Sequence, residues 1–133
     1  RKNPITKIPN PKQITMTEVS KPKIFNLEPR TEAFARAVRE FLGTLQKDIG
    51  TQEDVRQLIR SSGSIGANYI EANESLGKKD FVMKLRICRK EAKETTYWLN
   101  LLNTANPQRL ILINEAQELT AIFGSIITKV QWL

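Results

Sequence analysis

Residues 60–72 read Arg60-Ser61-Ser62-Gly63-Ser64-Ile65-Gly66-Ala67-Asn68-Tyr69-Ile70-Glu71-Ala72, and this run decides the fold. It lies inside a segment whose apolar residues recur at helical spacing. Glycine, however, costs a helix interior about 1 kcal/mol relative to alanine. We infer that tight packing compensates this cost, because small side chains let a neighbouring helix backbone approach. The residues expected to make that contact are Ser62, Gly63, Gly66 and Ala67.

Apolar spacings of three and four predict four helices in all. The first is expected over 31–49, with Gly50 as its C-terminal cap, and the second from a cap at Thr51 to about residue 73 or 75. The third is expected over 79–103. The fourth is expected from Pro107 to Gln131, because Asn106-Pro107 is a start signal. Short connections make an all-α, antiparallel up-down-up-down four-helix bundle the simplest architecture for residues 31–133.

The leading residues 1–30 differ from the rest of the chain. They contain five of the six prolines, which disfavour helix, and seven basic residues against two acidic ones. We therefore predict an extended, basic, Pro-rich N-terminal arm ahead of one helical domain. Whether this arm docks on the bundle or on a neighbouring subunit stays open.

Composition narrows the functional classes. A chain of 133 residues suits one domain, and we find no apolar stretch of roughly 18 residues, so we expect a soluble, cytoplasmic protein. The chain has no histidine, which removes the commonest general base and metal ligand. Cys88 is the only cysteine, and its place on an apolar stripe indicates a small buried hydrophobe. We expect no cofactor, no metal and no catalytic residues.

The net charge of +7 is unevenly distributed. Besides the arm, one concentration stands out between Lys78 and Lys93, where seven basic residues face two acidic ones. These seven residues are candidates for nucleic-acid binding: Lys78, Lys79, Lys84, Arg86, Arg89, Lys90 and Lys93. The alternative is that they form an ordinary solvated helix face. No helix-turn-helix, zinc finger or aromatic base-stacking platform is evident, so the expected sequence specificity is low. We assign Tyr69, Tyr97, Trp98 and Trp132 to the core or to an interface.

A second group of polar residues lies on the predicted second and third helices. We interpret it as a structural network in which an arginine and an asparagine satisfy carboxylates between helices. A carboxylate-only magnesium site is the alternative. The members are Arg60, Asn68, Glu71, Glu91 and Glu94.

Several motifs together resemble a known family. These are the run from Gln57 to Ser75, then Lys79-Asp80-Phe81, Lys90-Glu91-Ala92-Lys93-Glu94-Thr95 and Tyr97-Trp98-Leu99. They are similar to the four-helix-bundle proteins encoded in intervening sequences of bacterial 23S rRNA genes. The resemblance implies an up-down bundle and a ring-like homopentamer with a basic surface. More distantly, it extends to the accessory variability protein of diversity-generating retroelements, which works with a reverse transcriptase and nucleic acid. The long arm is a departure from the short family members.

Three functional hypotheses follow. The first is a non-enzymatic, homopentameric binding module for RNA or DNA that uses the third-helix cations and the arm. The second is a protein-interaction scaffold for a reverse transcriptase, a nuclease or a similar partner. The third, an enzyme that depends on Glu91 or Glu94, is the least favoured.

Overall fold

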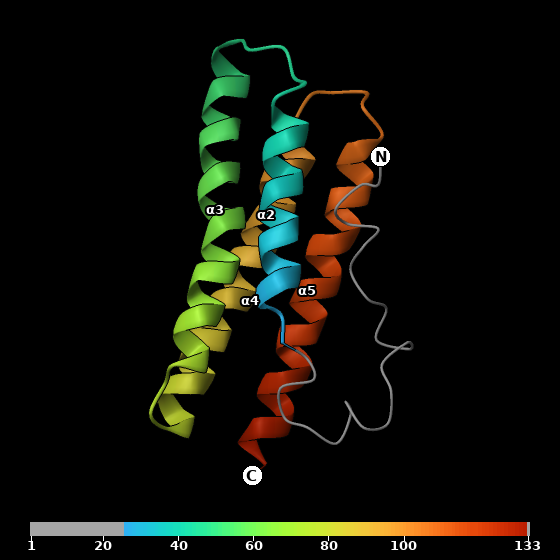
Figure 1. Cartoon of the computed structure of the whole chain (residues 1–133). Coiled ribbons are helices and arrows are strands. Elements are labelled where there is room, and N and C mark those ends of the chain that lie inside the picture. Colours follow the sequence, from blue (N-terminus) through green and yellow to red (C-terminus); the bar gives the residue numbers. More distant parts are fainter. Residues whose placement is uncertain (1–25, 133) are drawn as a thin grey trace.

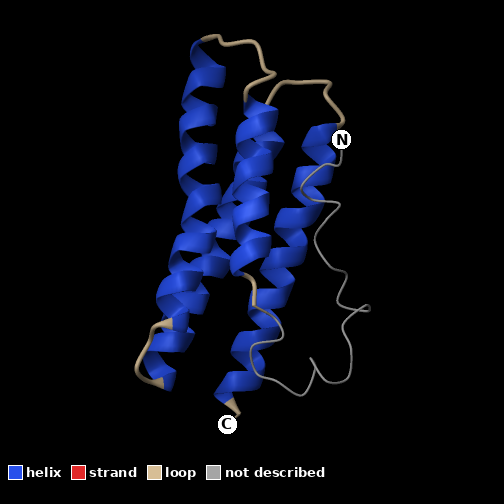
Figure 2. Cartoon of the chain, in the orientation of Figure 1, coloured by secondary structure: helices blue, strands red, loops and turns tan. Residues whose placement is uncertain are grey.

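Four α-helices make up the part of the chain that the computed structural model describes, residues 26–132. They are α2 (Glu28–Leu42), α3 (Ile49–Asn73), α4 (Lys78–Leu101) and α5 (Gln108–Gln131). Successive helices run in opposite directions, and only loops and turns join them (Figures 1 and 2). The predicted all-α antiparallel four-helix bundle is confirmed. Residues 1–25 of the predicted arm lie outside the described residues.

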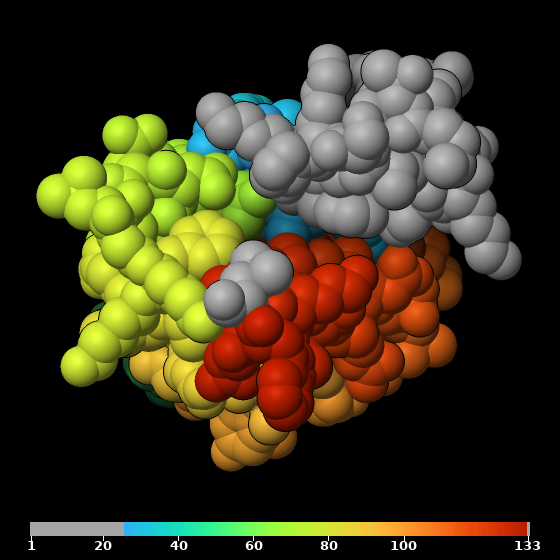
Figure 3. Space-filling view, turned by 90° about the horizontal axis from the view of Figure 1, so that it is seen from below, coloured from blue at the N-terminus to red at the C-terminus, as the bar shows by residue number. Residues whose placement is uncertain are grey.

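The four helices are arranged around a square. α3 packs against α2 and α4, and α5 packs against α4 and α2, so that α2 lies diagonally across the bundle from α4. The end-on view shows the α3–α4 turn beside the C-terminal end of α5 (Figure 3). One apolar core fills the centre, and its fully buried large side chains include Phe34, Phe123, Leu58, Ile65, Leu85, Leu99, Leu112 and Leu119.

The small-residue run lies within the unbroken helix α3, as predicted. At Gly66 the prediction of close approach is confirmed, because an added Cβ would lie 2.8 Å from Thr31 Oγ1 of α2. Ser62 is fully buried, whereas Gly63 is half-buried beside the guanidinium of Arg39. Ala67 is exposed, so its assignment to helix packing within the bundle is wrong. Only part of the run therefore serves the contact between α2 and α3.

The first helix ends earlier than predicted. α2 stops at Leu42, and the chain then turns at Gly43 and Thr44 before α3 begins. Gly43 is the C-terminal cap of α2, and its amide donates a hydrogen bond of 3.1 Å to the carbonyl of Arg39. A separate helix then starts after Asp48, whose side chain caps α3 by accepting a hydrogen bond of 2.8 Å from the Thr51 amide. Gly50 and Thr51 are thus inside α3, and their predicted capping roles are wrong. Ile49 continued the apolar spacing but is 88% exposed.

At its other end α2 begins at Glu28, three residues before the predicted start. Arg30 is therefore helical and belongs to the bundle. Its Nε and Nη2 donate hydrogen bonds of 2.8 and 2.9 Å to the carboxylate of Glu115, and Nη2 also donates to Glu118 at 2.9 Å. Arg30 and Glu115 are both buried, and the hydrogen bond to Glu115 is the main cause that raises the pKa of Arg30. This buried ion pair joins α2 to α5.

α5 is apolar enough, by length and composition, to be a membrane-span candidate, although no such stretch is expected from the sequence. Its apolar residues Leu112, Ala116, Leu119, Phe123 and Ile127 form part of the bundle core. One such helix with a core-facing stripe is typical of a helical bundle. α5 begins at Gln108, one residue after the predicted start, and Pro107 is its N-cap. Asn106 Oδ1 still accepts a hydrogen bond of 2.9 Å from the Gln108 amide.

Candidate nucleic-acid interface

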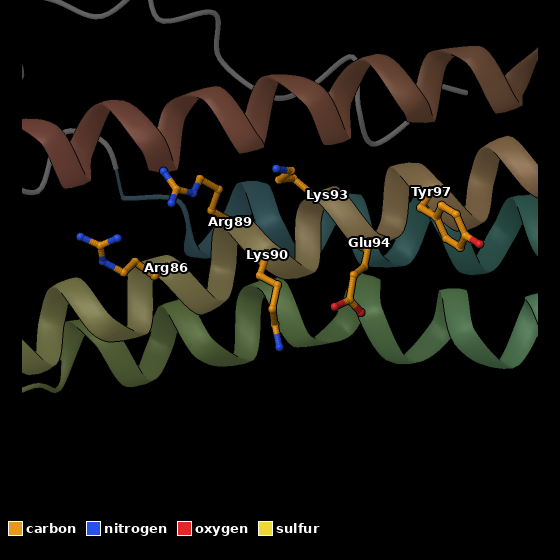
Figure 4. Close-up of a pocket in the computed structure, with 6 residues that line it drawn as sticks. All are labelled: Arg86, Arg89, Lys90, Lys93, Glu94 and Tyr97. Carbon is orange, nitrogen blue, oxygen red and sulfur yellow. The ribbon is translucent and has the colours of Figure 1, made fainter.

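A stripe of cations follows the outward side of α4. Lys79, Arg86, Lys90 and Lys93 are exposed and separated by seven, four and three residues, which places them on one face of the helix. The opposite face carries the core residues Val82, Leu85, Cys88, Ala92, Thr95 and Leu99. The apolar stripe therefore fixes the direction in which the cations point. Figure 4 shows Arg89 and Lys93 extending toward α5, and Lys90 and Glu94 toward α3.

Not all of the seven predicted cations are equally available. Lys84 Nζ forms an ion pair of 2.8 Å with Glu71 of α3, and this hydrogen bond raises the pKa of the ammonium group. Lys78 donates to the backbone carbonyl of Gln131 at 3.4 Å, and Lys90 lies 3.6 Å from the carboxylate of Glu91. Within residues 26–132, five of the seven form no ion pair: Lys78, Lys79, Arg86, Arg89 and Lys93.

The central cations line an open surface hollow of about 370 Å³ (Figure 4). All of its lining residues come from α4: Arg86, Arg89, Lys90, Lys93, Glu94 and Tyr97. Arg89 is half-buried and lies over Gly124 of α5, where an added Cβ would be 3.8 Å from its Nη1. The missing side chain at Gly124 thus leaves room for the Arg89 side chain along the α4–α5 contact. This hollow combines four positive charges with one carboxylate and one aromatic ring.

Tyr97 is the functional candidate that the sequence reading missed. The sequence predicts a core or interface position for Tyr97, but its side chain is 57% exposed and borders the hollow. Its ring meets the half-buried Trp98 ring at a centroid distance of 5.1 Å and an angle of 75°. The sequence spacing could have indicated this position, because Tyr97 follows Lys93 by four residues and Lys90 by seven and so lies on the same face of the helix. Of the other aromatic residues, Tyr69 is buried and Trp132 is exposed.

The predicted polar network is not assembled. Asn68 donates to the carbonyl of Ser64 in its own helix, and Glu71 pairs with Lys84. Arg60 is exposed and forms no ion pair within the described residues, and Glu94 lies at the hollow. The register between α3 and α4 places Lys84 opposite Glu71, and within the described residues no ion pair joins Arg60 to Glu91 or Glu94. Three further polar contacts between helices were not predicted from the sequence: Arg30–Glu115, Ser61–Thr95 at 2.8 Å and Asn73–Glu28 at 2.8 Å.

Cys88 is buried in the core, and desolvation raises the pKa of its thiol to about 12. This placement agrees with the prediction of a small buried hydrophobe. Within the part of the chain that the structure describes, no group of three or more acidic, cysteine or histidine side chains is placed to hold a metal ion.

A second hollow, of about 430 Å³, lies between α2 and α3. Its floor includes the small residues Ala35, Gly63, Gly66 and Ala67, and the half-exposed Ile70 borders it. We call it the α2–α3 groove. Because α4 is diagonal to α2, the groove and the cation stripe lie on different sides of the bundle.

Comparison with known proteins agrees with this architecture. The family model described as "23S rRNA-intervening sequence protein" matches residues 29–128. A crystal structure from Bacteroides thetaiotaomicron, of a protein with unknown function from the S23 ribosomal protein family, is similar to this chain with a TM-score of 0.67 and 30% identity. The similarity covers 76% of this chain and 97% of that one. A search of the curated proteins gave no match. The match across all four helices shows that the chain belongs to the 23S rRNA-intervening sequence protein family.

Proposed function

We propose that this protein binds the sugar–phosphate backbone of RNA or DNA through the outward face of α4, with low sequence specificity and without catalysis. The observation that carries the proposal is the group of cations around the hollow, of which Arg86, Arg89 and Lys93 form no ion pair within residues 26–132. Cations that replace the counterions of phosphates gain free energy from their release. The proposal implies a cytoplasmic protein that meets nucleic acid there.

Low specificity follows from the kind of side chain presented. Phosphate contacts by lysine and arginine set the position of a nucleic acid but carry no direct sequence information. Lys84 is excluded from this surface because Glu71 already pairs with it. The binding face is thus smaller than the seven cations predicted from the sequence.

Binding is tested by fluorescence anisotropy with labelled oligonucleotides over a series of salt concentrations. The double variant Arg86→Glu/Lys93→Glu is expected to lose binding. The single variant Lys93→Ala, which removes one cation without adding a repulsive charge, is expected to lower the slope of log K against log[salt] by about 0.7 for a single strand.

The matched control reverses two exposed lysines that are not part of the stripe, Lys47→Glu/Lys129→Glu, with the same change in net charge. This control is expected to retain most of the affinity. Binding that is absent, independent of salt or equally reduced by the control would contradict the proposal. Recovery of one protein partner with no nucleic acid would instead favour a scaffold for a reverse transcriptase or nuclease.

We further propose that the chain forms a homo-oligomeric ring, with five subunits as the resemblance implies, through the α2–α3 groove. The groove supports this because its small residues allow close approach and Ile70 offers an exposed apolar side chain at its edge. Because the groove and the stripe are on different sides of the bundle, assembly through the groove would leave the α4 cations accessible. A ring would then place several copies of the stripe around one axis and strengthen binding through multivalency.

Assembly is tested by light scattering after size-exclusion chromatography, with and without nuclease treatment. Ala67→Arg places a large charged side chain in the groove and is expected to yield monomers. Ala67 is exposed, so the substitution leaves the core of the monomer intact. Ala105→Arg adds the same charge in the exposed α4–α5 connection and is expected to keep the wild-type mass. A monomeric wild-type protein would overturn the ring.

A further inference from the structure

The hollow on α4 contains two residues that phosphate binding does not explain, Glu94 and Tyr97. Both follow the cations along the helix, so the hollow has a positive end at Arg86 to Lys93 and a different end at Glu94 to Tyr97. One helical turn, about 6 Å along the axis, separates Lys93 from Tyr97. The two ends are therefore close enough to contact different parts of one nucleotide and its neighbour.

Glu94 is exposed, and its carboxylate forms no ion pair within the described residues. A carboxylate is an acceptor only, so it repels a phosphate and accepts hydrogen bonds from N–H donors. Nucleobases carry such donors on their Watson–Crick edges. The charge at this end of the hollow thus favours a base over a phosphate.

Tyr97 supplies an aromatic surface for that base. The ring is 57% exposed, which leaves room for contact from solvent. Trp98 meets it at 75° rather than face to face, and Trp98 itself packs against the core. The contact holds the Tyr97 ring beside the hollow without the parallel stacking that would cover its face. Little side-chain entropy is then lost when a planar group stacks on it.

We propose that this hollow binds single-stranded nucleic acid, with an unpaired base stacked on Tyr97 and the neighbouring phosphates on Arg89 and Lys93. The inference rests on the proposed function and deepens it by naming the class of nucleic acid. In a duplex the faces of the bases are already stacked and their Watson–Crick edges are paired, so neither Tyr97 nor Glu94 can reach its target. Single strands, loops and ends present unstacked bases to aromatic side chains.

The test compares a short single strand, the same strand in a duplex, and an abasic strand of equal length, all by fluorescence anisotropy. Tyr97→Ala is expected to weaken single-strand binding about 5- to 150-fold, as expected for one stacked base. For the duplex, and likewise for the abasic strand, the affinity of Tyr97→Ala should equal that of the wild type. Tyr97→Phe keeps the ring and is the matched control, expected to bind the single strand as the wild type does.

The outcomes separate the two proposals. If Arg86→Glu/Lys93→Glu abolishes binding while Tyr97→Ala changes nothing, or weakens the single strand and the duplex alike, the stacking inference is wrong and phosphate binding stands. If Arg86→Glu/Lys93→Glu also leaves binding unchanged, the proposed function fails. Circular dichroism of each variant checks that the bundle is folded, which the exposure of Tyr97 leads us to expect.

Discussion

Gly66 of α3 faces Thr31 of α2 so closely that an added Cβ would lie 2.8 Å from Thr31 Oγ1 and 3.2 Å from Thr31 Cβ. Thr31 Oγ1 is held in place, because it donates a hydrogen bond of 2.7 Å to the carbonyl of Leu27. Gly66→Ala is therefore expected to lower the free energy of unfolding by about 1–3 kcal/mol through overpacking, despite the better helix propensity of alanine. Urea denaturation measures the change.

Gly63→Ala is the control for this prediction. Its added Cβ would meet only the far end of the flexible Arg39 side chain, at 3.4 Å. Alanine should then stabilise the helix by up to about 1 kcal/mol. Equal effects at the two glycines would show that close packing does not account for Gly66.

The Arg30–Glu115 ion pair predicts a second stability effect. Glu115→Ala leaves a buried guanidinium with only the half-exposed Glu118 as partner, so we expect a loss of about 3 kcal/mol in the free energy of unfolding, the low end for a broken buried pair. Glu118→Ala should cost less than about 1 kcal/mol. The double variant Arg30→Met/Glu115→Leu should recover most of the loss. Failure to recover would mean that the pair itself stabilises the bundle.

The contribution of Asp48 to the stability of the bundle is expected to depend on pH. Hydrogen bonding to the Thr51 amide lowers the pKa of Asp48 from its ordinary value of 3.8. A lowered native pKa means that the stabilising contribution is complete above the unfolded value and is lost as the pH falls through the native one. Asp48→Ala should therefore lower Tm at pH 7, and the difference from wild type should shrink below pH 3.8. Asp48→Asn, which still caps the helix, should lie closer to wild type at pH 7.

Cys88 should be unreactive in the folded protein. Burial raises the pKa of its thiol to about 12, so almost no thiolate exists at pH 8, and reagents cannot reach the sulfur. Alkylation followed by mass spectrometry should label Cys88 only in denaturant. Rapid labelling of the native protein would contradict the core position of this residue.

Much of the fold follows from the sequence, because apolar residues at helical spacing with glycines among them are most simply explained by helices that pack closely in a bundle. Gly66 is an example, since its cost in an isolated helix is compensated only by a close neighbour, which proves to be Thr31. The end of α2 could not be read in the same way. Leu45 and Ile49 extend its apolar spacing, and only the cap geometry of Asp48 reveals that the chain has already left the helix.

The candidate site was predictable in part. The cations of α4 were visible as a concentration of charge, and helical spacing alone assigns Arg86, Lys90 and Lys93 to one face. Glu71 pairs with Lys84 because of the register between α3 and α4. The spacing of residues within a single helix does not reveal that register. The exposure of Tyr97 depends likewise on which part of α4 faces its neighbours.

The difference in helix length has a consequence for how the chain folds. α2 has 15 residues, whereas α3, α4 and α5 have 24 or 25, and α2 reaches α5 through residues 85 positions apart. Contacts between consecutive helices form early, while the distant closing contact carries the larger loop entropy. We expect α3, α4 and α5 to assemble first and α2 to dock last. Native-state hydrogen exchange should then show α2 amides opening at lower free energy than those of α4, and uniform protection would contradict this order.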